Sequence, residues 1–354
     1  MKKVLITGGA GFIGHHLVDY LLQRTDWDLI LLDRLDTSGN LNRLKELESV
    51  QNAGSRVRFV WHDLKAEINE FVGKEIGVVD HVIHLAASSH VDRSIENPLE
   101  FAMDNVVGTT NLLNWARKGG MKKDIQDAPI VGDFGVRSKE MVLGYTGKFI
   151  NFSTDEVFGP ADLGHDHKED EPHKPSNPYS ASKSGQGAMG YAFYITYGLP
   201  VITTYTMNNF GERQHPEKLI PACIRNVLAG TEMPIFAELE GEELKGVGSR
   251  FWLHSKNTAS AIKHIIENGV VGEAYNVVGF DEFTNEEICQ KVADIIGKPL
   301  VKKYVDFHQT RPGHDRRYSL DGTKLKGLGW TPEVTFDESL KEVVEFTMSH
   351  DKWA

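Results

Sequence analysis

The chain has 354 residues, of which 40% are hydrophobic and 25% charged, so it is long enough for a large core and two lobes. A formal net charge of −11 without a basic block argues against a nucleic-acid partner, and no run approaches the roughly 18 apolar residues of a membrane span. The two distant cysteines form neither a disulfide framework nor a metal-ligand cluster. We therefore expect a cytoplasmic protein with no signal peptide, no membrane segment and no bound metal.

Residues 4–22, with the sequence VLITGGAGFIGHHLVDYLL, predict a strand, a glycine-rich turn and a helix. The glycines allow the backbone to approach a diphosphate, and the N–H groups at the start of the helix face its negative charge. The residues expected to contact this cofactor are Gly8, Gly11, Phe12, Ile13 and Gly14.

The second predicted strand, residues 29–32, ends in Asp33, about twenty residues after the glycines. A carboxylate at this place accepts hydrogen bonds from the adenosine ribose and repels a 2′-phosphate, which favours NAD over NADP. The alternative is a glycine-rich turn followed by a solvated aspartate. Arg34 follows directly, and its positive charge would weaken the exclusion of NADP.

Two further predicted strands, residues 57–60 and 79–85, continue the alternation of strand and helix patterns. This alternation predicts an α/β fold with a doubly wound parallel (Rossmann) sheet and a smaller C-terminal lobe. Ligands of such sheets bind beyond the carboxyl ends of the strands, so the residues that follow these two strands are expected near the ligands. They are Asp63, Leu64, Ala86, Ala87 and Ser88 for the cofactor, followed by Ser89 and His90.

The stretch FSTDEVFG (152–159) places Thr154, Asp155 and Glu156 where a strand predicted over 148–152 ends. Tyr179 and Lys183 follow at a spacing of four, which places them on one face of a helix. A lysine ammonium beside a tyrosine hydroxyl lowers the pKa of the phenol, so that the tyrosine becomes a usable base. By itself this spacing is mostly structural, but after a dinucleotide-binding unit it indicates catalysis. A strand-end cap is the alternative for residues 154–156.

Three motifs, TGGAGFIG (7–14), STDEVFG (153–159) and YSASK (179–183), resemble the nucleotide-sugar-modifying branch of the extended short-chain dehydrogenase/reductase family. More narrowly, AASSHVDRSIENP (86–98), PEKLIP (216–221) and RPGHDRRYSLDGTKLKGLGW (311–330) are similar to dTDP-glucose 4,6-dehydratases, and the match runs through nearly the whole chain. The adjacent acids at 155 and 156 are its specific part, since epimerases and decarboxylases of the branch usually carry other residues there. The resemblance implies tightly held NAD and a homodimer.

The implied reaction removes water across carbons 5 and 6 of a hexose. A base and a hydride acceptor oxidise carbon 4, a second base removes the carbon-5 proton, an acid protonates the departing carbon-6 hydroxyl, and the hydride returns to carbon 6. Tyr179 is expected to be the first base, tuned by Lys183, with Thr154 hydrogen-bonded to the carbon-4 hydroxyl. By resemblance, Glu156 removes the carbon-5 proton and Asp155 is the acid. The residues alone leave open which carboxyl takes which role, although neighbouring acids can push their pKa values apart.

A NAD-binding domain is expected over residues 1–205, and a nucleotide-sugar-binding lobe over 206–354, with segments after 248 returning to the first domain. By resemblance, Asn209 faces the cofactor and Phe236 stacks on the nucleotide base. Two arginines suit a diphosphate, because their planar forks make paired charge-assisted hydrogen bonds. The substrate residues implied are Ser89, His90, Asn208, Lys218, Leu219, Pro234, Phe236, Arg250, Asn276, Arg311 and His314. Beyond these motifs, Thr284 and Glu287 predict a capping box at the start of a helix over 285–296.

The chain departs from the family pattern in three respects. The segment 119–147 is roughly twenty residues longer than the corresponding segment of the family. This favours a surface or interface element over an active-site lid. The segment 238–248 is about six residues longer than in the family, and it is expected to form an acidic solvated loop near the nucleotide base. Ser88 and the run 250–257 each lack an acidic residue that the family carries, and Asp104 stands where the family often has threonine.

These patterns predict an NAD-dependent nucleoside-diphosphate-hexose 4,6-dehydratase that acts on dTDP-glucose. The closest alternative is a 4-epimerase or decarboxylase that uses the same 4-keto intermediate, and the adjacent acids argue against it because epimerisation needs no acid for a leaving hydroxyl. A non-catalytic NAD-binding protein is the remote alternative, and the intact set of five candidate catalytic residues argues against it.

Overall fold

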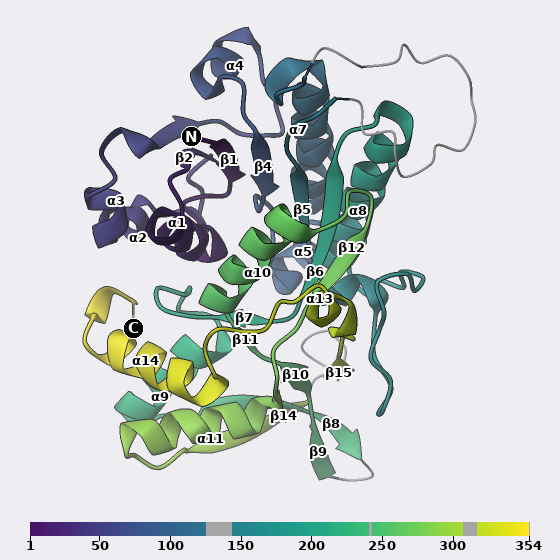
Figure 1. Cartoon of the computed structure of the whole chain (residues 1–354). Coiled ribbons are helices and arrows are strands. Elements are labelled where there is room, and N and C mark those ends of the chain that lie inside the picture. The colour runs from purple at the N-terminus through teal and green to yellow at the C-terminus, as the bar shows by residue number, and fades with distance from the viewer. Residues whose placement is uncertain (125–143, 241–242, 307–316, 354) are drawn as a thin grey trace.

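A computed structural model of the chain describes residues 1–124, 144–240, 243–306 and 317–353. Its centre is a seven-stranded parallel sheet with the order β12-β6-β5-β4-β1-β2-β3 (Figure 1). The order reverses between β1 and β4, which is the point where such sheets bind their ligands. The predicted doubly wound parallel sheet is confirmed. Its strands are β1 (Lys3–Thr7), β2 (Asp28–Asp33), β3 (Val57–Trp61), β4 (His81–His84), β5 (Phe149–Thr154), β6 (Val201–Thr206) and β12 (Ala274–Val277).

Helices cover both faces of this sheet. Alternate strand residues point to opposite faces, so Val4 and Ile6 pack with one buried cluster and Leu5 with the other. The first cluster includes apolar residues of α1 (Phe12–Arg24) and α10 (Ser255–Asn268), and the second includes those of α7 (Gly108–Trp115) and α8 (Pro178–Tyr197). Burial on both faces explains why these strands read as continuous apolar runs in the sequence.

Short helical segments complete the larger lobe and connect its elements. The α-helices are α2 (Leu41–Lys45), α3 (Glu48–Gln51), α4 (Glu70–Ile76), α5 (Val91–Glu96), α6 (Pro98–Ala102) and α13 (Thr323–Gly327). The 3-10 turns are η1 (Gly54–Arg56), η5 (Asp155–Phe158) and η6 (Asp351–Trp353), and the π-helical turns are η2 (Met103–Val107) and η3 (Ala116–Gly120).

The smaller lobe lies below the large sheet in Figure 1 and has a separate core. Its helices α9 (Leu219–Ala229), α11 (Asn285–Ile296) and α14 (Phe336–Met348) pack their apolar faces together. The predicted capping box is present, since the Thr284 hydroxyl accepts a hydrogen bond from the Glu287 N–H and the Glu287 carboxylate accepts one from the Thr284 N–H. Three small sheets accompany the helices: β14-β8-β9, whose strand β8 packs into the core of the smaller lobe, β13-β10-β15 and β11-β7. Their strands are β7 (Asn209–Phe210), β8 (Met233–Glu240), β9 (Glu243–Val247), β10 (Ser249–Phe251), β11 (Leu253–His254), β13 (Glu282–Thr284), β14 (Lys302–Asp306) and β15 (Arg317–Tyr318).

The segment 238–248 is mostly a β-hairpin, so the expected acidic loop is wrong. Strands β8 and β9 pair antiparallel, and only positions 241–242 between them fall outside the described residues. Ala237 is fully buried while Glu238 is not. Glu238 therefore belongs to a strand in which buried and less buried residues alternate, a period-two pattern that a count of charges does not reveal.

The other long segment, 119–147, lies mainly outside the described residues. Its described ends are joined by the bridge between Lys123 and Tyr145, and Met121 pairs with Val79 just before β4. Its role as a surface element rather than a lid stays a prediction.

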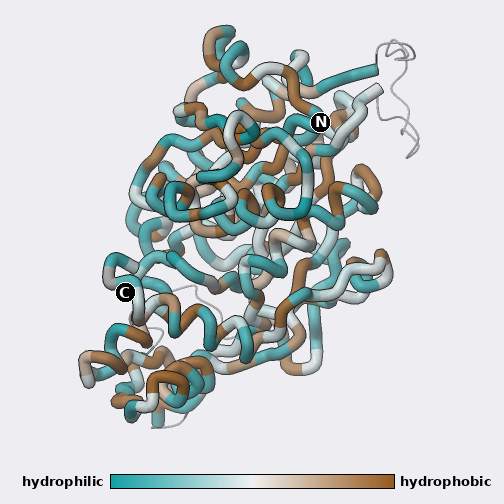
Figure 2. The backbone as a smooth tube through the Cα atoms, turned by 60° about the vertical axis from the view of Figure 1, so that its left-hand side comes forward, coloured by the Kyte–Doolittle hydropathy of each residue, from teal (hydrophilic) through white to brown (hydrophobic). Residues whose placement is uncertain are grey.

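None of the helices in the described ranges combines the length and the hydropathy that a membrane span requires. Hydrophobic and hydrophilic stretches alternate along the backbone of both lobes (Figure 2).

Candidate active site

One large pocket, of about 730 Å³, opens at the carboxyl ends of the central strands and reaches into the smaller lobe. It gathers residues from segments that lie far apart in the chain. All the described residues that the sequence predicted as sites line it, except Asn276. Arg311 and His314 lie outside the described residues.

The glycine-rich turn forms one wall of the pocket and has the geometry that a diphosphate needs. Gly8 has a φ of +71°, and a Cβ atom on Gly14 would lie 2.1 Å from the Gly8 carbonyl oxygen. Helix α1 begins at Phe12 without a capping side chain on Gly11. Its first N–H groups are therefore available to an anionic ligand, as in dinucleotide-binding folds.

Asp33 lies at the end of β2 beside this turn, where it suits an adenosine ribose. It is 7% exposed, and it accepts hydrogen bonds from the backbone N–H groups of Ala10 (3.0 Å) and Leu35 (2.9 Å). These contacts fix the carboxyl group, while burial raises its pKa. The residues present thus fit a dinucleotide with an unphosphorylated ribose.

Arg34, which was expected to weaken the exclusion of NADP, is held by carboxylates. Its guanidinium donates to both oxygens of Asp104, at 2.6 and 2.8 Å, and to Asp36 at 2.8 Å. Charge-assisted forks of this kind are strong and directional. The Arg34 charge is therefore balanced within the protein.

Two departures from the family pattern meet at this point. Ser88, which stands where the family carries an acid, donates its hydroxyl hydrogen to Asp104 Oδ2 at 2.5 Å. Asp104, which stands where threonine is frequent in the family, thus places a carboxylate beside Ser88, where the family carries an acidic residue. Neighbouring Asn105 was missed by the sequence analysis; it accepts from the Ser88 N–H at 2.8 Å and donates to the Ser182 hydroxyl at 2.8 Å. Asp104 and Asn105 lie in the π-helical turn η2, which has no recognisable sequence signal. Such turns are frequent at functional sites.

The candidate catalytic residues converge where β5 ends. The strand runs through Thr154, two residues further than predicted, and the turn η5 begins at Asp155. The Thr154 hydroxyl caps this turn by accepting from the Glu156 N–H at 3.4 Å, and it donates to Asp155 Oδ1 at 2.7 Å. It is also a hydrogen-bond partner of the Tyr179 phenol, which reaches it from α8.

The tuning of Tyr179 by Lys183 stays a prediction, because the hydrogen bonds that Lys183 makes in this structure are with other groups. Lys183 donates to the Phe152 carbonyl oxygen at 2.7 Å and to Gln186 Oε1 at 2.6 Å, and burial lowers its pKa to about 7. Burial, and then the negative charge of Glu156, raise the pKa of Tyr179. The spacing of four placed the two side chains on one face correctly, but spacing does not fix where the ammonium group points.

The two adjacent acids have different surroundings. Asp155 is 3% exposed and its pKa is raised, chiefly by burial, against the effects of Thr154 and Arg250. Glu156 is only partly buried, and it accepts a hydrogen bond from the Asn177 amide at 3.4 Å. Burial therefore favours the protonated form of Asp155, as a general acid requires.

The substrate side of the pocket is built from both lobes. Phe236 reaches it from β8, Lys218 and Leu219 from the start of α9, and Arg250, which is 4% exposed, from β10. Arg225 also lines it and was missed, because no motif distinguishes it from a surface arginine on α9.

Asn276, expected to bind substrate, lies elsewhere. Its side chain is fully buried and donates to the carbonyl oxygens of His167 (2.9 Å) and Asp321 (3.0 Å). These bonds join β12 to the loops that contain His167 and Asp321, and Asn276 does not line the pocket.

Comparisons with known proteins agree with this geometry. The profile of the family described as GDP-mannose 4,6 dehydratase matches residues 5–343. The chain belongs to this family. The predicted resemblance to extended short-chain dehydrogenases/reductases of the dTDP-glucose 4,6-dehydratase type is thereby confirmed.

Three relatives illustrate the relationship within the dehydratase family. The low-salt glycan biosynthesis protein Agl12 of Haloferax volcanii is 35% identical over 99% of both chains. The dTDP-glucose 4,6-dehydratase of Neisseria meningitidis serogroup B is 36% identical over 100% of this chain and 95% of its own. The crystal structure of the dTDP-glucose 4,6-dehydratase DesIV of Streptomyces venezuelae, with NAD bound, superposes with a TM-score of 0.83 at 34% identity, covering 99% of this chain and 98% of its own.

Proposed function

We propose that this chain is an NAD-dependent nucleoside-diphosphate-hexose 4,6-dehydratase that converts dTDP-glucose to dTDP-4-keto-6-deoxyglucose. The observation that carries the proposal is the placement of two adjacent carboxyls, Asp155 and Glu156, beside Thr154 and Tyr179 in a pocket that fits a dinucleotide. Relatives that are named dTDP-glucose 4,6-dehydratases, and that align over nearly the whole chain, support the substrate assignment.

The cofactor side of the pocket would hold NAD. The turn of Gly8, Gly11 and Gly14 would take the diphosphate, and Asp33 the adenosine ribose. When bound, NAD supplies the hydride acceptor and later returns the hydride. Residues 1–205 together with β12 would form the NAD-binding domain, and residues from 206 onward would contribute most of the nucleotide-sugar site.

The protein side chains would remove two protons from the sugar and supply two. Tyr179, whose phenolate the ammonium group of Lys183 would stabilise, takes the proton of the carbon-4 hydroxyl, and Thr154 orients that hydroxyl by a hydrogen bond. The resulting ketone acidifies carbon 5, from which Glu156 removes a proton. Asp155 protonates the departing carbon-6 hydroxyl, a role supported by its raised pKa. As carbon 6 regains the hydride, Glu156 returns a proton, exchanged with solvent, to carbon 5.

The nucleotide diphosphate would lie between the lobes. Phe236 would stack on the base, and Arg250 and Arg225 would pair with phosphate oxygens, while Asn208 and Lys218 contact the remainder of the substrate. The substrate roles of Arg311 and His314 rest on the sequence motif alone.

We also propose a cytoplasmic homodimer. The reducing compartment is supported by Cys223 and Cys289, which are both buried free thiols. The homodimer is supported by family resemblance, and light scattering on the purified protein tests it through the molar mass.

The substrate assignment is tested by incubating the protein with dTDP-, UDP-, GDP- and CDP-glucose in separate reactions. Mass spectrometry then reads the loss of one water from each nucleotide sugar. We expect dTDP-glucose to lose water at a higher rate than the other three nucleotide sugars. Loss of carbon dioxide, or isomerisation without loss of mass, would instead support a decarboxylase or an epimerase.

A further inference from the structure

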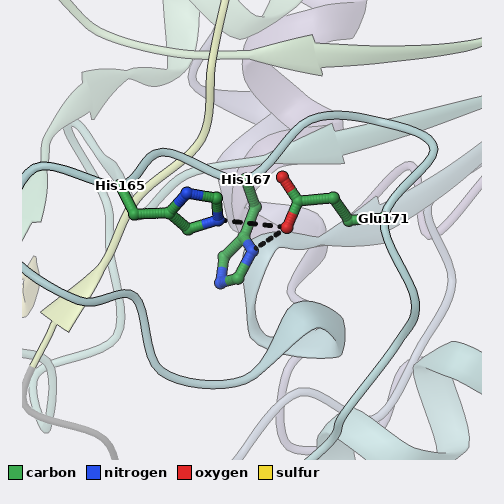
Figure 3. A group of neighbouring side chains, drawn as sticks. All are labelled: His165, His167 and Glu171. Carbon is green, nitrogen blue, oxygen red and sulfur yellow. Dashed lines mark hydrogen bonds and ion pairs between the residues drawn. The ribbon is translucent and has the colours of Figure 1, made fainter.

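A second cluster of chemically reactive side chains lies outside the pocket, in the loop between the catalytic turn η5 and helix α8. It contains His165, His167 and Glu171 (Figure 3). Both imidazoles point at the same carboxylate oxygen, Glu171 Oε2: His165 Nε2 lies at 3.1 Å and His167 Nδ1 at 2.7 Å. None of these residues lines the pocket.

Hydrogen bonds around the cluster fix its orientation. The second ring nitrogen of His167, Nε2, lies 3.3 Å from the Pro160 carbonyl oxygen, to which it can only donate. In a neutral imidazole the proton is then on Nε2, and the lone pair of Nδ1 points at Glu171. Glu171 Oε1 accepts from the Lys168 N–H at 3.0 Å, which holds the carboxylate in place. A backbone carbonyl that binds the outer N–H is the usual partner of a metal-ligating histidine.

The backbone of the loop is also held in place. The His167 N–H donates to the Ser319 carbonyl oxygen at 3.1 Å, and the His167 carbonyl oxygen accepts from the Asp321 N–H at 2.9 Å. The His167 ring stacks on Phe158, with centroids 5.4 Å apart and an interplanar angle of 16°. Phe158 is the last residue of η5, so the ring packs directly against the catalytic turn.

Neighbouring charges do not prevent a cation from binding at the cluster. Arg317 donates to the His165 carbonyl oxygen at 2.8 Å, but its guanidinium is paired with Asp166 at 3.0 Å and Glu282 at 2.8 Å. The cluster is therefore a carboxylate faced by two ring nitrogens, with the nearby arginine balanced by its own acids.

The ligand set suits a particular kind of ion. Three lone-pair donors that converge on one point repel each other unless a proton or a metal ion lies between them. Two imidazoles and one carboxylate suit Zn²⁺, which binds nitrogen and oxygen at about 2.0–2.2 Å, whereas Ca²⁺ and Mg²⁺ prefer oxygen donors. The three ligand atoms lie within 4.8 Å of one another, and His165, whose side chain is 49% exposed, leaves a position open to water.

We propose that His165, His167 and Glu171 form a Zn²⁺ site that cross-links the loop between the catalytic turn and α8. The two distant cysteines predicted no bound metal, but the pattern HDHKEDE (165–171) offers a different ligand set. The site does not depend on the dehydratase assignment, because its residues lie outside the pocket.

Zn²⁺ binding to the purified full-length chain, prepared without a polyhistidine tag and stripped with a chelator, tests the site. Competition with a chromophoric chelator should give one Zn²⁺ per chain. His165→Gln, His167→Gln and Glu171→Gln should each weaken binding by at least about 100-fold, since loss of even an outer partner costs 10–100-fold. His350→Gln, which changes an exposed histidine between α14 and η6, should bind like the parent.

Two results of the binding assay would overturn the proposal: a parent chain that takes up no Zn²⁺, or variants that bind it as tightly as the parent. His165 is exposed and makes no core contact, so its variant should remain folded, which the melting temperature in excess chelator checks. Zn²⁺ should raise the melting temperature of the parent and of His350→Gln but not that of His165→Gln. Equal shifts in all three would also contradict the site.

Discussion

Burial of a carboxyl group has opposite consequences for catalysis and for stability, and Asp155 shows both. Its side chain is 3% exposed, and its Oδ2 atom has no hydrogen-bond partner among the described residues. A buried charge without full pairing costs free energy, so the environment that prepares this group to act as an acid also destabilises the fold.

Asp155→Asn should therefore raise the free energy of unfolding at pH 8 while abolishing dehydration. The folded-state pKa of Asp155 is raised, so above that pKa the buried group is charged and the cost is fully present. Below the unfolded-state pKa the group is neutral in both states, and the difference between variant and parent should vanish. We expect a gain of at least about 1 kcal/mol at pH 8, measured by denaturant unfolding across pH. A less stable variant at pH 8 would contradict this account.

Tyr179 and Glu156 act at different steps in the proposed mechanism, so their variants should fail differently. Tyr179→Phe removes the first base and should show no transient absorbance of reduced nicotinamide in stopped flow. Glu156→Gln keeps the first base and should oxidise carbon 4, accumulate that absorbance and form no 4-keto-6-deoxy product. Both variants should retain bound NAD. Turnover of Glu156→Gln at the parent rate would show that another group removes the carbon-5 proton.

The bond between Arg34 and Asp104 predicts an effect on cofactor choice. In Asp104→Thr the guanidinium loses its bidentate partner and becomes available to a 2′-phosphate. We expect the ratio of the NADP to NAD dissociation constants, measured by calorimetry, to fall by at least about tenfold, since charge-assisted bonds are worth more than 1.4 kcal/mol. The double variant with Arg34→Ala should lose this gain. An unchanged ratio in the single variant would mean that Arg34 does not reach the ribose.

At the scale of elements, local sequence signals predicted well those features that depend on local chemistry. The capping box of Thr284 and Glu287 is an example, because both hydrogen bonds form within one turn of α11. The hairpin β8–β9 is the opposite case. Its pairing depends on a partner strand, and its acidic residues suggested a solvated loop when read one by one.

Thr284→Ala should lower the free energy of unfolding by about 1 kcal/mol, as for other N-cap substitutions. Thr284→Ser keeps the accepting hydroxyl and should behave like the parent. Urea denaturation followed by circular dichroism compares the three proteins. Equal loss in the serine variant would indicate that the threonine methyl group, rather than the cap, carries the stability.

At the scale of the whole molecule, the sequence located most of the site because topology constrains it. Parallel strands bring their carboxyl ends to one edge, so Asp33, Ala86 and Thr154 had to meet there once the sheet was recognised. What the sequence could not give is side-chain direction and contacts across the fold. Lys183 points at Phe152 and Gln186, Asn276 points away from the pocket, and Asp104 compensates for Ser88 across 16 residues of chain.

In the proposed reaction one pocket oxidises a hexose, removes water and returns the same hydride to a different carbon. The most direct measurement uses dTDP-glucose deuterated at carbon 4, with the product analysed by nuclear magnetic resonance. We predict a 4-keto-6-deoxy product that carries the deuterium at carbon 6 and a solvent-derived hydrogen at carbon 5. Deuterium returned to carbon 4, or lost to the solvent, would contradict the account.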